Sequence, residues 1–287
     1  MEKINFMKKE KYDSNFDSKV VKDFGSEWSK YDQSELSDND RREMYHSYFH
    51  IFPWEYLPTR AVGADIGCGS GRWALLVAPR VEHLYLVDPS DQALIVAKRN
   101  LKHISNTTFL QESVDKISIK KNSLDFAYSL GVCHHVPDTL SAIKSISLLL
   151  KPGAPFLIYL YYSFENRPWW FRVLWRISDF IRRLVSKLPF FLKNLICDGI
   201  ALTIYYPLSR FAAVIEKFGF CPLSLPLSYY RNRRFYVMRT DALDRFGTRL
   251  EKRFKQKQIQ DMLLSSGFTN IQFSCNQPFW CAVGFKT

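Results

Sequence analysis

The chain has 287 residues, of which 47% are hydrophobic and 24% are charged. This ordinary globular composition excludes a largely disordered or fibrous protein, and the length favours one α/β core with an elaboration. Lys and Arg outnumber Asp and Glu by 40 to 28, but the basic clusters are short and scattered, so we expect no nucleic-acid partner. A basic surface in solution is the first interpretation of this charge, and an anionic membrane or a phosphorylated substrate stays open.

The cysteines and the apolar runs limit the metal, redox and membrane interpretations. Six cysteines lie far apart without a CxxC pair, so we expect neither a zinc site nor a disulfide framework. Residues 1–19 lack the apolar core of a signal peptide, and no uncharged apolar stretch approaches the length of a membrane span. We therefore expect no metal and a cytoplasmic location, with peripheral attachment to a membrane as the alternative.

In chain order, a polar segment up to residue 40 precedes apolar and aromatic residues at helical spacing over 41–57, which end at Pro58. Short apolar runs and helical patterns then alternate. They predict strands at 61–66, 83–87, 107–111, 123–130 and 154–161, and helices at 73–78, 92–101 and 138–150. Apolar strands that alternate with helices predict a parallel sheet covered on both faces. This is a doubly wound, Rossmann-like α/β fold, whose ligands bind at the carboxyl ends of the strands.

The alternation stops at Phe164, and the chain to about residue 252 is rich in aromatic residues and arginine. Apolar residues recur at helical spacing over 169–184 with arginines between them. Three interpretations of this region stay open. The first is a folded lid that packs its apolar face on the core, the second is docking of a lipid-linked or hydrophobic anionic substrate at a membrane, and the third is a dimerisation surface. Regular elements then return, a helix at 256–266 and a hairpin of strands at 270–274 and 280–285.

The strongest local signal is a glycine-rich turn between the first strand and the next helix. Gly67, Gly69 and Gly71 stand where side chains would block the approach of a ligand to the backbone, and the helix N-terminus offers free N–H groups. A dinucleotide-binding fingerprint would have its third glycine at the position of Arg72. The pattern therefore disfavours a nicotinamide-dependent dehydrogenase.

Two aspartates sharpen this interpretation. Asp65 ends the first strand, where a carboxylate suits a ligand with an ammonium or sulfonium group better than a pyrophosphate. Asp88 ends the second strand, where an acidic side chain accepts hydrogen bonds from both hydroxyls of a ribose. Capping of a tight turn explains either residue alone, whereas the whole set predicts a ligand site.

At these residues the sequence resembles the class I S-adenosylmethionine-dependent methyltransferases, in their small-molecule, type 11-like branch. The resemblance covers about 60–162 and 255–287, with the motifs of the family in order. It implies a seven-stranded, mostly parallel sheet with an antiparallel last strand and a helical lid insertion. It also implies S-adenosylmethionine as the methyl donor and S-adenosylhomocysteine as the product. The cofactor-binding residues that it implies are Asp65, Gly67, Cys68, Gly69, Gly71, Asp88, Pro89, Ser113, Val114 and Leu130.

His134 and His135 follow the fourth strand and are the candidate catalytic residues, because a neutral imidazole there can take a proton from an attacking hydroxyl or amine. The alternative, ranked slightly ahead, is that the pair only shapes the cofactor pocket, since methyl transfer can proceed by proximity and orientation alone. The aromatic segment 24–31 is interpreted equally well as a flap over the cofactor or as an anchor on the core. Candidate substrate residues, by their position near the mouth of the site, are Tyr161, Tyr229, Tyr230 and Arg231.

These observations predict an N-terminal extension or flap at 1–60, a methyltransferase core at 61–163 and 254–287, and a substrate lid at 164–253. The expected reaction is methyl transfer from S-adenosylmethionine to a small-molecule acceptor, with oxygen slightly favoured over nitrogen or carbon. The alternatives are a lipid-linked or membrane-associated acceptor and a non-catalytic module that binds S-adenosylmethionine. The sequence identifies neither the acceptor nor the oligomeric state.

Overall fold

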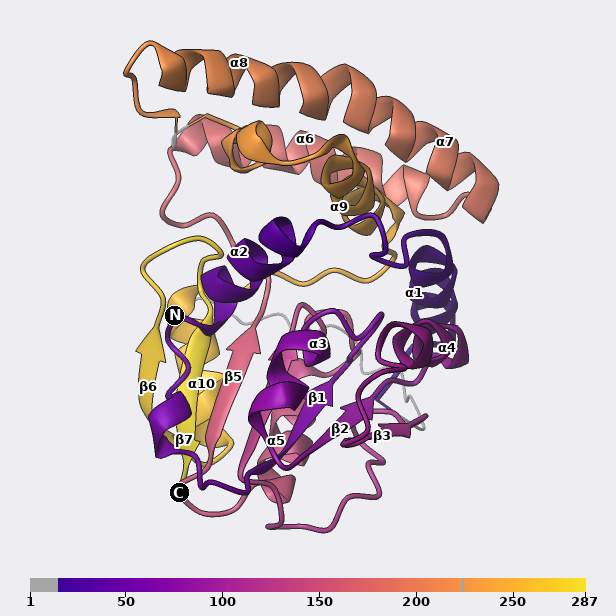
Figure 1. Cartoon of the computed structure of the whole chain (residues 1–287). Coiled ribbons are helices and arrows are strands. Elements are labelled where there is room, and N and C mark those ends of the chain that lie inside the picture. Colours follow the sequence, from indigo (N-terminus) through magenta and orange to yellow (C-terminus); the bar gives the residue numbers. More distant parts are fainter. Residues whose placement is uncertain (1–14, 223–224) are drawn as a thin grey trace.

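The computed structural model describes residues 15–222 and 225–287, so residues 1–14 of the predicted N-terminal extension lie outside the described part. Seven strands form one sheet in the order β3-β2-β1-β4-β5-β7-β6 (Figure 1). Neighbouring strands are parallel, except that β7 runs antiparallel to both β5 and β6. The strands are β1 Val62–Ile66, β2 His83–Val87, β3 Thr107–Leu110, β4 Phe126–Leu130, β5 Pro155–Tyr159, β6 Phe268–Phe273 and β7 Ala282–Lys286. This confirms the predicted Rossmann-like sheet with an antiparallel last strand.

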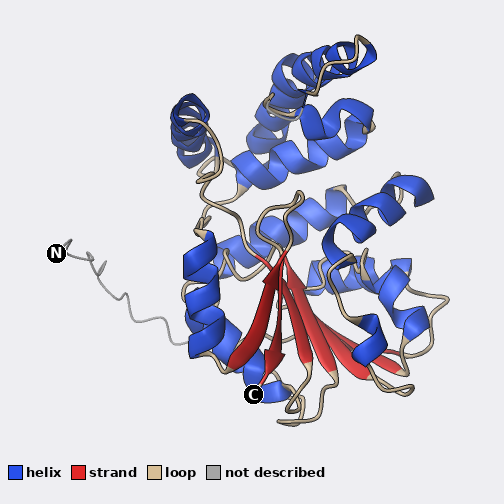
Figure 2. Ribbon diagram, turned by 90° about the vertical axis from the view of Figure 1, so that its left-hand side faces the viewer, coloured by secondary structure: helices blue, strands red, loops and turns tan. Residues whose placement is uncertain are grey.

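Helices cover both faces of the sheet (Figure 2). Successive residues of a strand point to opposite faces, so Ala64 and Ile66 of β1 share one face and pack in a cluster with residues of α5 and α10. The opposite face packs with residues of α2, α3 and α4 in a second cluster. The helices of the core and the N-terminal segment are α1 Ser18–Lys30, α2 Asp38–Phe49, α3 Ala74–Val77, α4 Asp91–Asn100, α5 Thr139–Leu149 and α10 Gln256–Ser265.

Two predicted helices are shorter than their apolar patterns suggest, and proline is the reason in both. The helix expected over 41–57 ends at Phe49, and after Pro53 the chain forms only a 3₁₀ turn. The helix expected over 73–78 is the single turn α3, because Pro79 has no N–H to continue it and a 3₁₀ turn follows.

A helical insertion lies between β5 and α10. In Figure 1, α7 and α8 lie farthest from the sheet, and α9 packs against α6, α7 and α1. A stretch of π-helix joins α7 to α8. The insertion consists of α6 Trp169–Val185, α7 Phe190–Ile200, η3 Ala201–Tyr205, α8 Tyr206–Lys217, η5 Ser228–Asn232 and α9 Phe235–Gly247.

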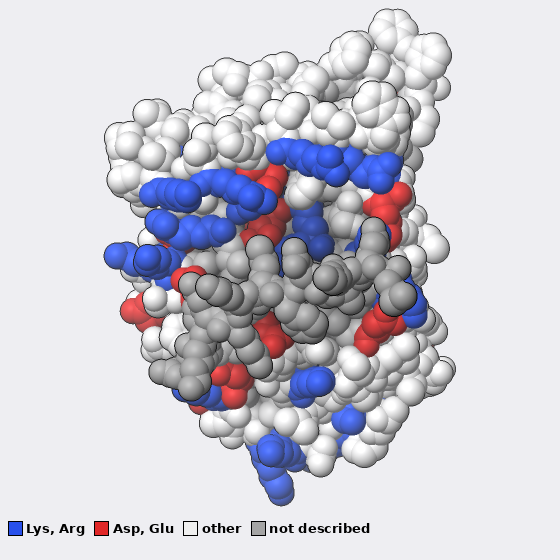
Figure 3. Space-filling model, turned by 180° about the vertical axis from the view of Figure 1, so that it is seen from behind, with Lys and Arg blue, Asp and Glu red and all other residues white. Residues whose placement is uncertain are grey.

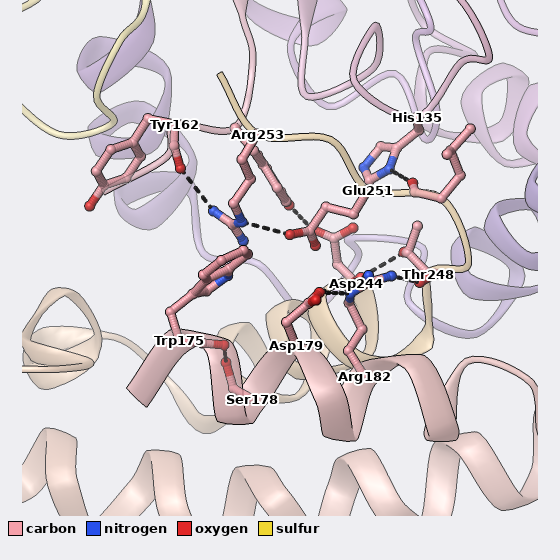
Figure 4. Close-up of polar contacts among 12 residues, drawn as sticks. His135, Tyr162, Trp175, Ser178, Asp179, Arg182, Asp244, Thr248, Glu251 and Arg253 are labelled. Atoms are coloured by element: carbon pink, nitrogen blue, oxygen red, sulfur yellow. Dashed lines mark hydrogen bonds and ion pairs between the residues drawn. The ribbon is translucent and has the colours of Figure 1, made fainter. Parts of the chain in front are cut away.

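The orientation of α6 contradicts the preferred interpretation that its apolar face packs on the core. Phe180 is 64% exposed, whereas Arg182 is only 7% exposed. The Arg182 guanidinium donates to the Asp179 carboxylate and to the carbonyl oxygen of Thr248 on the returning chain, at 2.8 and 2.9 Å (Figure 4). These inward polar contacts fix the rotation of the helix, and the rotation turns the apolar stripe outward.

Candidate functional site

A cavity of about 320 Å³ lies at the carboxyl ends of the central strands. Its wall combines the residues that follow β1, β2 and β4 with Phe24, Glu27 and Trp28 of α1 and with residues of the insertion. This is the edge where open parallel sheets bind ligands, and the volume falls within the usual range for a small-molecule site.

The glycines of the turn after β1 are required by neighbouring side chains of the protein. Gly69 has φ +52°, and a Cβ there would lie 2.8 Å from the Trp28 indole; at Gly67, with φ +79°, a Cβ would lie 2.4 Å from Val132. A Cβ at Gly71 would meet Leu101 at 2.5 Å. The positive φ values and these close approaches explain why the turn needs glycine, and Trp28 lies directly on the turn.

Asp88 holds the glycine turn at the cavity wall. Its carboxylate accepts from the backbone N–H of Gly69 at 3.0 Å and of Ser90 at 2.9 Å. Burial raises the pKa of Asp88 to about 6, although these two hydrogen bonds oppose the shift. The side chain is therefore mostly ionised at neutral pH and still has lone pairs directed toward a ligand.

Asp65 lies behind the turn and not on the cavity wall. It is 1% exposed, and burial raises its pKa to about 8, while the neighbouring Tyr128 hydroxyl opposes the shift. One of its carboxylate oxygens has no hydrogen-bond partner among the described residues. At neutral pH this group is therefore mostly protonated, and a positive charge nearby, such as that of a sulfonium or ammonium group, would favour its ionised form.

The other predicted cofactor residues divide into two groups. Those on the wall of the cavity are Gly67, Cys68, Asp88, Pro89, Ser113, Val114 and Leu130, whereas Asp65, Gly69 and Gly71 lie behind it. The backbone N–H groups of the turn at Gly67, Cys68, Gly69 and Gly71 are used within the protein. The features that fit a nucleoside with a cationic group are the ionised Asp88 and the orphaned oxygen of Asp65.

The two histidines have different surroundings. His135 lines the cavity, and its Nδ1 lies 2.6 Å from the carbonyl oxygen of Leu250. Because a carbonyl only accepts, Nδ1 carries the proton and Nε2 keeps a lone pair, which has no partner among the described residues. Burial lowers the pKa of His135 below 6.5, so the ring is neutral at pH 7.

His134 is fully buried, and the cavity wall does not include it. Its ring packs between those of Tyr161 and His135, with centroids 3.9 and 4.0 Å away. Burial lowers the pKa of His134 well below its ordinary value. His134 is thus buried among rings and is not part of the cavity wall, whereas His135 is.

Three of the four predicted substrate residues line the cavity. Tyr161, Tyr229 and Tyr230 lie on its wall, whereas Arg231 does not. The Arg231 guanidinium instead donates two hydrogen bonds, each 2.9 Å long, to the Glu216 carboxylate of α8. Arg231 is thus removed from the predicted substrate set by its partner on the outer side of the insertion.

Sequence reasoning missed the half-buried carboxylates of α9. Asp241 and Asp244 line the cavity beside Glu27. The Tyr230 hydroxyl donates to Asp241 at 2.7 Å, and the Tyr161 hydroxyl donates to Asp244. Burial is the largest cause that raises the pKa of Glu27 and Asp241, and Asp244 raises both further. The signal in the sequence was the pair of acids three residues apart, which lie on one face of α9 with Thr240 and Arg245.

Two features of residues 15–222 and 225–287 bear on metals and membranes. No group of three or more His, Cys, Asp or Glu side chains in this part of the chain is arranged to hold a metal ion. Within the same ranges, no helix is both long and apolar enough to cross a bilayer.

Comparisons with known proteins agree with this geometry. The fold is shared with a solved S-adenosylmethionine-dependent methyltransferase of Thermotoga maritima, described as a possible histamine N-methyltransferase. The TM-score is 0.50 at 13% identity, and the match covers 92% of this chain and 100% of that one. Residues 64–158 match the family model described as a methyltransferase domain. This stretch runs from β1 to β5 and includes the glycine turn, Asp88 and His135. The chain therefore contains a class I, type 11-like, S-adenosylmethionine-dependent methyltransferase domain.

Two curated relatives show how far the likeness extends. The chain is 29% identical over 134 residues to phosphoethanolamine N-methyltransferase 2 of Caenorhabditis elegans, which covers 46% of this chain and 29% of the relative. It is 29% identical over 105 residues to a ubiquinone biosynthesis O-methyltransferase of Nitrosospira multiformis, which covers 36% and 42%. The chain thus spans less than half the length of either relative, and the insertion lies outside the family match.

Proposed function

We propose that the protein transfers a methyl group from S-adenosylmethionine to an oxygen atom of a small-molecule acceptor. The observation that carries this proposal is the unpaired Nε2 of His135 in the cavity wall. A hydroxyl must lose its proton to become a good nucleophile, and a fixed neutral imidazole is a suitable base. An amine acceptor is the nearest rival, because it too reacts in its neutral form.

Residues of the cavity wall would bind the cofactor, accept the proton and orient the acceptor. The turn after β1, Asp88, Ser113 and Val114 would hold the cofactor, which supplies an electrophilic methyl group when bound. Nε2 of His135 would accept the proton of the acceptor hydroxyl, while the hydrogen bond from Nδ1 to Leu250 keeps the ring in the required tautomer. The carboxylates of α9 and Glu27 would orient the acceptor by accepting hydrogen bonds from its donors.

A lipid-linked acceptor is the second candidate, favoured by the outer wall of the cavity. There the lining consists mainly of apolar side chains from the insertion and from the loop between β6 and β7, namely Phe164, Phe171, Leu225, Leu227, Pro278 and Phe279. Such a wall suits an acceptor with a hydrophobic part. In this case the protein would work at the face of a membrane rather than throughout the cytoplasm.

Incubation of the protein with methyl-labelled S-adenosylmethionine and a cell extract, followed by separation into aqueous and organic phases, tests these candidates. Label that moves into water-soluble compounds supports the proposal, and label that moves into the organic phase supports the lipid-linked acceptor. Calorimetry with S-adenosylhomocysteine completes the test. Tight binding without any transfer of label would instead identify a non-catalytic module, and the same measurement on a His135→Ala variant separates the base from the pocket wall.

A further inference from the structure

The outer face of the insertion carries most of the exposed apolar surface of the protein. Among the described residues, every exposed large apolar side chain but four lies between residues 169 and 220. The exposed fraction is 71% for Trp169 and 76% for both Phe191 and Phe218. Soluble proteins rarely expose apolar patches of this size, and those that do use them for binding.

Basic residues run beside this apolar face. On α6, Arg172, Arg176 and Arg183 are spaced by four and seven residues, so they form one row along the helix. The apolar stripe of Trp169, Ile177 and Phe180 lies next to this row. Figure 3 shows the arrangement from behind, with an upper part that carries few charges and rows of Lys and Arg below it. An apolar stripe flanked by arginine is typical of a helix that lies in the plane of a membrane interface.

The charges of this region are unbalanced toward the positive. The only acids in 169–220 are Asp179, Asp198 and Glu216, and each is already paired within the protein. None of the ion pairs of the described residues includes Arg172, Arg176, Lys187 or Lys217. These exposed cations are available for an anionic partner from outside. The same face of a second copy offers none, because its own acids are already paired and it carries the same excess of positive charge.

We propose that α6, α7 and α8 dock on an anionic lipid bilayer, with Trp169, Phe191 and Phe218 in the interface and the arginine row at the level of the phosphates. The Arg182 guanidinium, which the neighbouring Asp179 orients, donates to the carbonyl oxygens of Thr248 and Arg249 and so holds α6 in this orientation against the rest of the protein. Docking does not depend on the enzymatic proposal. It places the apolar wall of the cavity, which includes Phe171 of α6, on the side of the membrane.

Flotation of the full chain with phosphatidylcholine vesicles, with and without phosphatidylglycerol, tests the proposal. We expect binding to the anionic vesicles only, and a decline as salt is added. The combined variant Phe180→Glu, Phe191→Glu, Phe218→Glu should weaken binding at least about tenfold. Its matched control places glutamate at three exposed apolar positions of the core, Tyr56, Ile95 and Leu264, and should bind like the wild type.

A second pair of variants tests the charge. Arg172→Gln, Arg176→Gln and Lys187→Gln together should weaken binding to anionic vesicles about tenfold or more. The control removes three exposed lysines of the core, Lys120, Lys121 and Lys144. Circular dichroism and thermal unfolding confirm that all four variants fold. Equal losses in the insertion and core variants would show that net charge, not this face, binds the vesicles.

Quenching of tryptophan fluorescence by brominated lipids locates the docking face. Trp169 and Trp170 are exposed on α6, so their fluorescence should be quenched, and a Trp169→Phe, Trp170→Phe variant should lose the quenching while it still binds. Quenching that persists in this variant would place another face on the membrane. The proposal is overturned if the protein does not bind anionic vesicles. It is also overturned if sedimentation reveals a dimer that the combined variant Phe180→Glu, Phe191→Glu, Phe218→Glu dissociates.

Discussion

The sheet core and the helical insertion distribute their apolar and charged residues in opposite ways. In the core, Phe126 and Phe156 are fully buried, and the polar groups of the site stand where strands end. In the insertion, Arg182 is turned inward and is nearly buried, while Phe191 and its apolar neighbours face outward. The two regions meet at the cavity, where residues of both form the wall.

This contrast indicates what stabilises each region. Full burial of one large apolar side chain contributes about 1.5–3 kcal/mol, and the core uses this contribution throughout. The outer helices of the insertion forgo it at many positions, so their attachment depends more on inward polar contacts. Figure 4 shows Arg182 of α6, held by Asp179 of the same helix, in contact with Thr248 of the chain that returns to the core. A surface that gains nothing from burial within the protein remains available for a partner.

The largest expected effect is the loss of the contact between α6 and the returning chain. Arg182→Ala removes a buried guanidinium and leaves the Thr248 carbonyl without its donor. We expect the free energy of unfolding to fall by about 3 kcal/mol, as measured by urea denaturation. The matched control is Arg183→Ala, because Arg183 pairs with the same Asp179 but its side chain is 69% exposed. That change should cost about 1 kcal/mol or less, and equal effects would contradict the contrast between inward and outward charges.

The next effect concerns the base on the core side of the cavity. His135→Ala should lower kcat about a hundredfold or more and leave the affinity for S-adenosylhomocysteine within about threefold. The reason is that Nε2 is unpaired and its ring is held by Leu250 rather than by a contact needed for cofactor binding. His103→Ala, at an exposed histidine of the core, serves as the control. A parallel fall in cofactor affinity and thermal stability would make His135 a wall of the pocket instead.

The pH profile gives an independent check on the same residue. Burial lowers the pKa of His135 from 6.5, so its neutral, basic form persists below that pH. Turnover should therefore stay level from pH 8 to about 6.5 and then fall tenfold per unit once pH drops below the lowered pKa. In the His135→Ala variant the residual rate should lose this acid limb. A limb that survives the substitution would belong to Asp88 or another group.

Cofactor affinity should depend on Asp88 to a smaller extent. Its carboxylate holds the turn through Gly69 and Ser90 and has lone pairs left for ribose hydroxyls. Asp88→Ala should weaken S-adenosylhomocysteine binding at least about tenfold by calorimetry, because charge-assisted hydrogen bonds contribute about 1.5–3 kcal/mol each. Asp88→Asn keeps only one of the two oxygens that accept from Gly69 and Ser90, so it should weaken binding less than Asp88→Ala. Asp91→Ala, outside the cavity wall, should change affinity less than twofold.

The same contrast explains what the sequence could and could not reveal. The strands and the turn at Gly67 are local features, because an apolar run or a cluster of glycines can be recognised from a few consecutive residues. The positive φ values of the glycines agree with that interpretation. The seven-stranded sheet with an antiparallel last strand was implied by the family resemblance, whereas the order of the strands is seen only in the structure. The contact of Trp28 with Gly69 joins segments far apart in the chain, so no local pattern predicts it. For α6 the apolar stripe was visible, but its direction depends on Arg182 and the Thr248 carbonyl, which only the folded chain brings together.

The smallest effect tests whether the insertion closes on the cavity as a lid. Tyr229 and Tyr230 line the cavity, and the tryptic sites at Arg231, Arg233 and Arg234 follow them directly. If ligand in the cavity holds these tyrosines, saturating S-adenosylhomocysteine should slow cleavage there about three- to tenfold, because cleavage requires local opening. The exposed Lys120 and Lys121 provide an internal control in the core, where the rate should not change. Equal slowing at both places would indicate general stabilisation by the ligand, and no slowing at either would separate the insertion from the cofactor site.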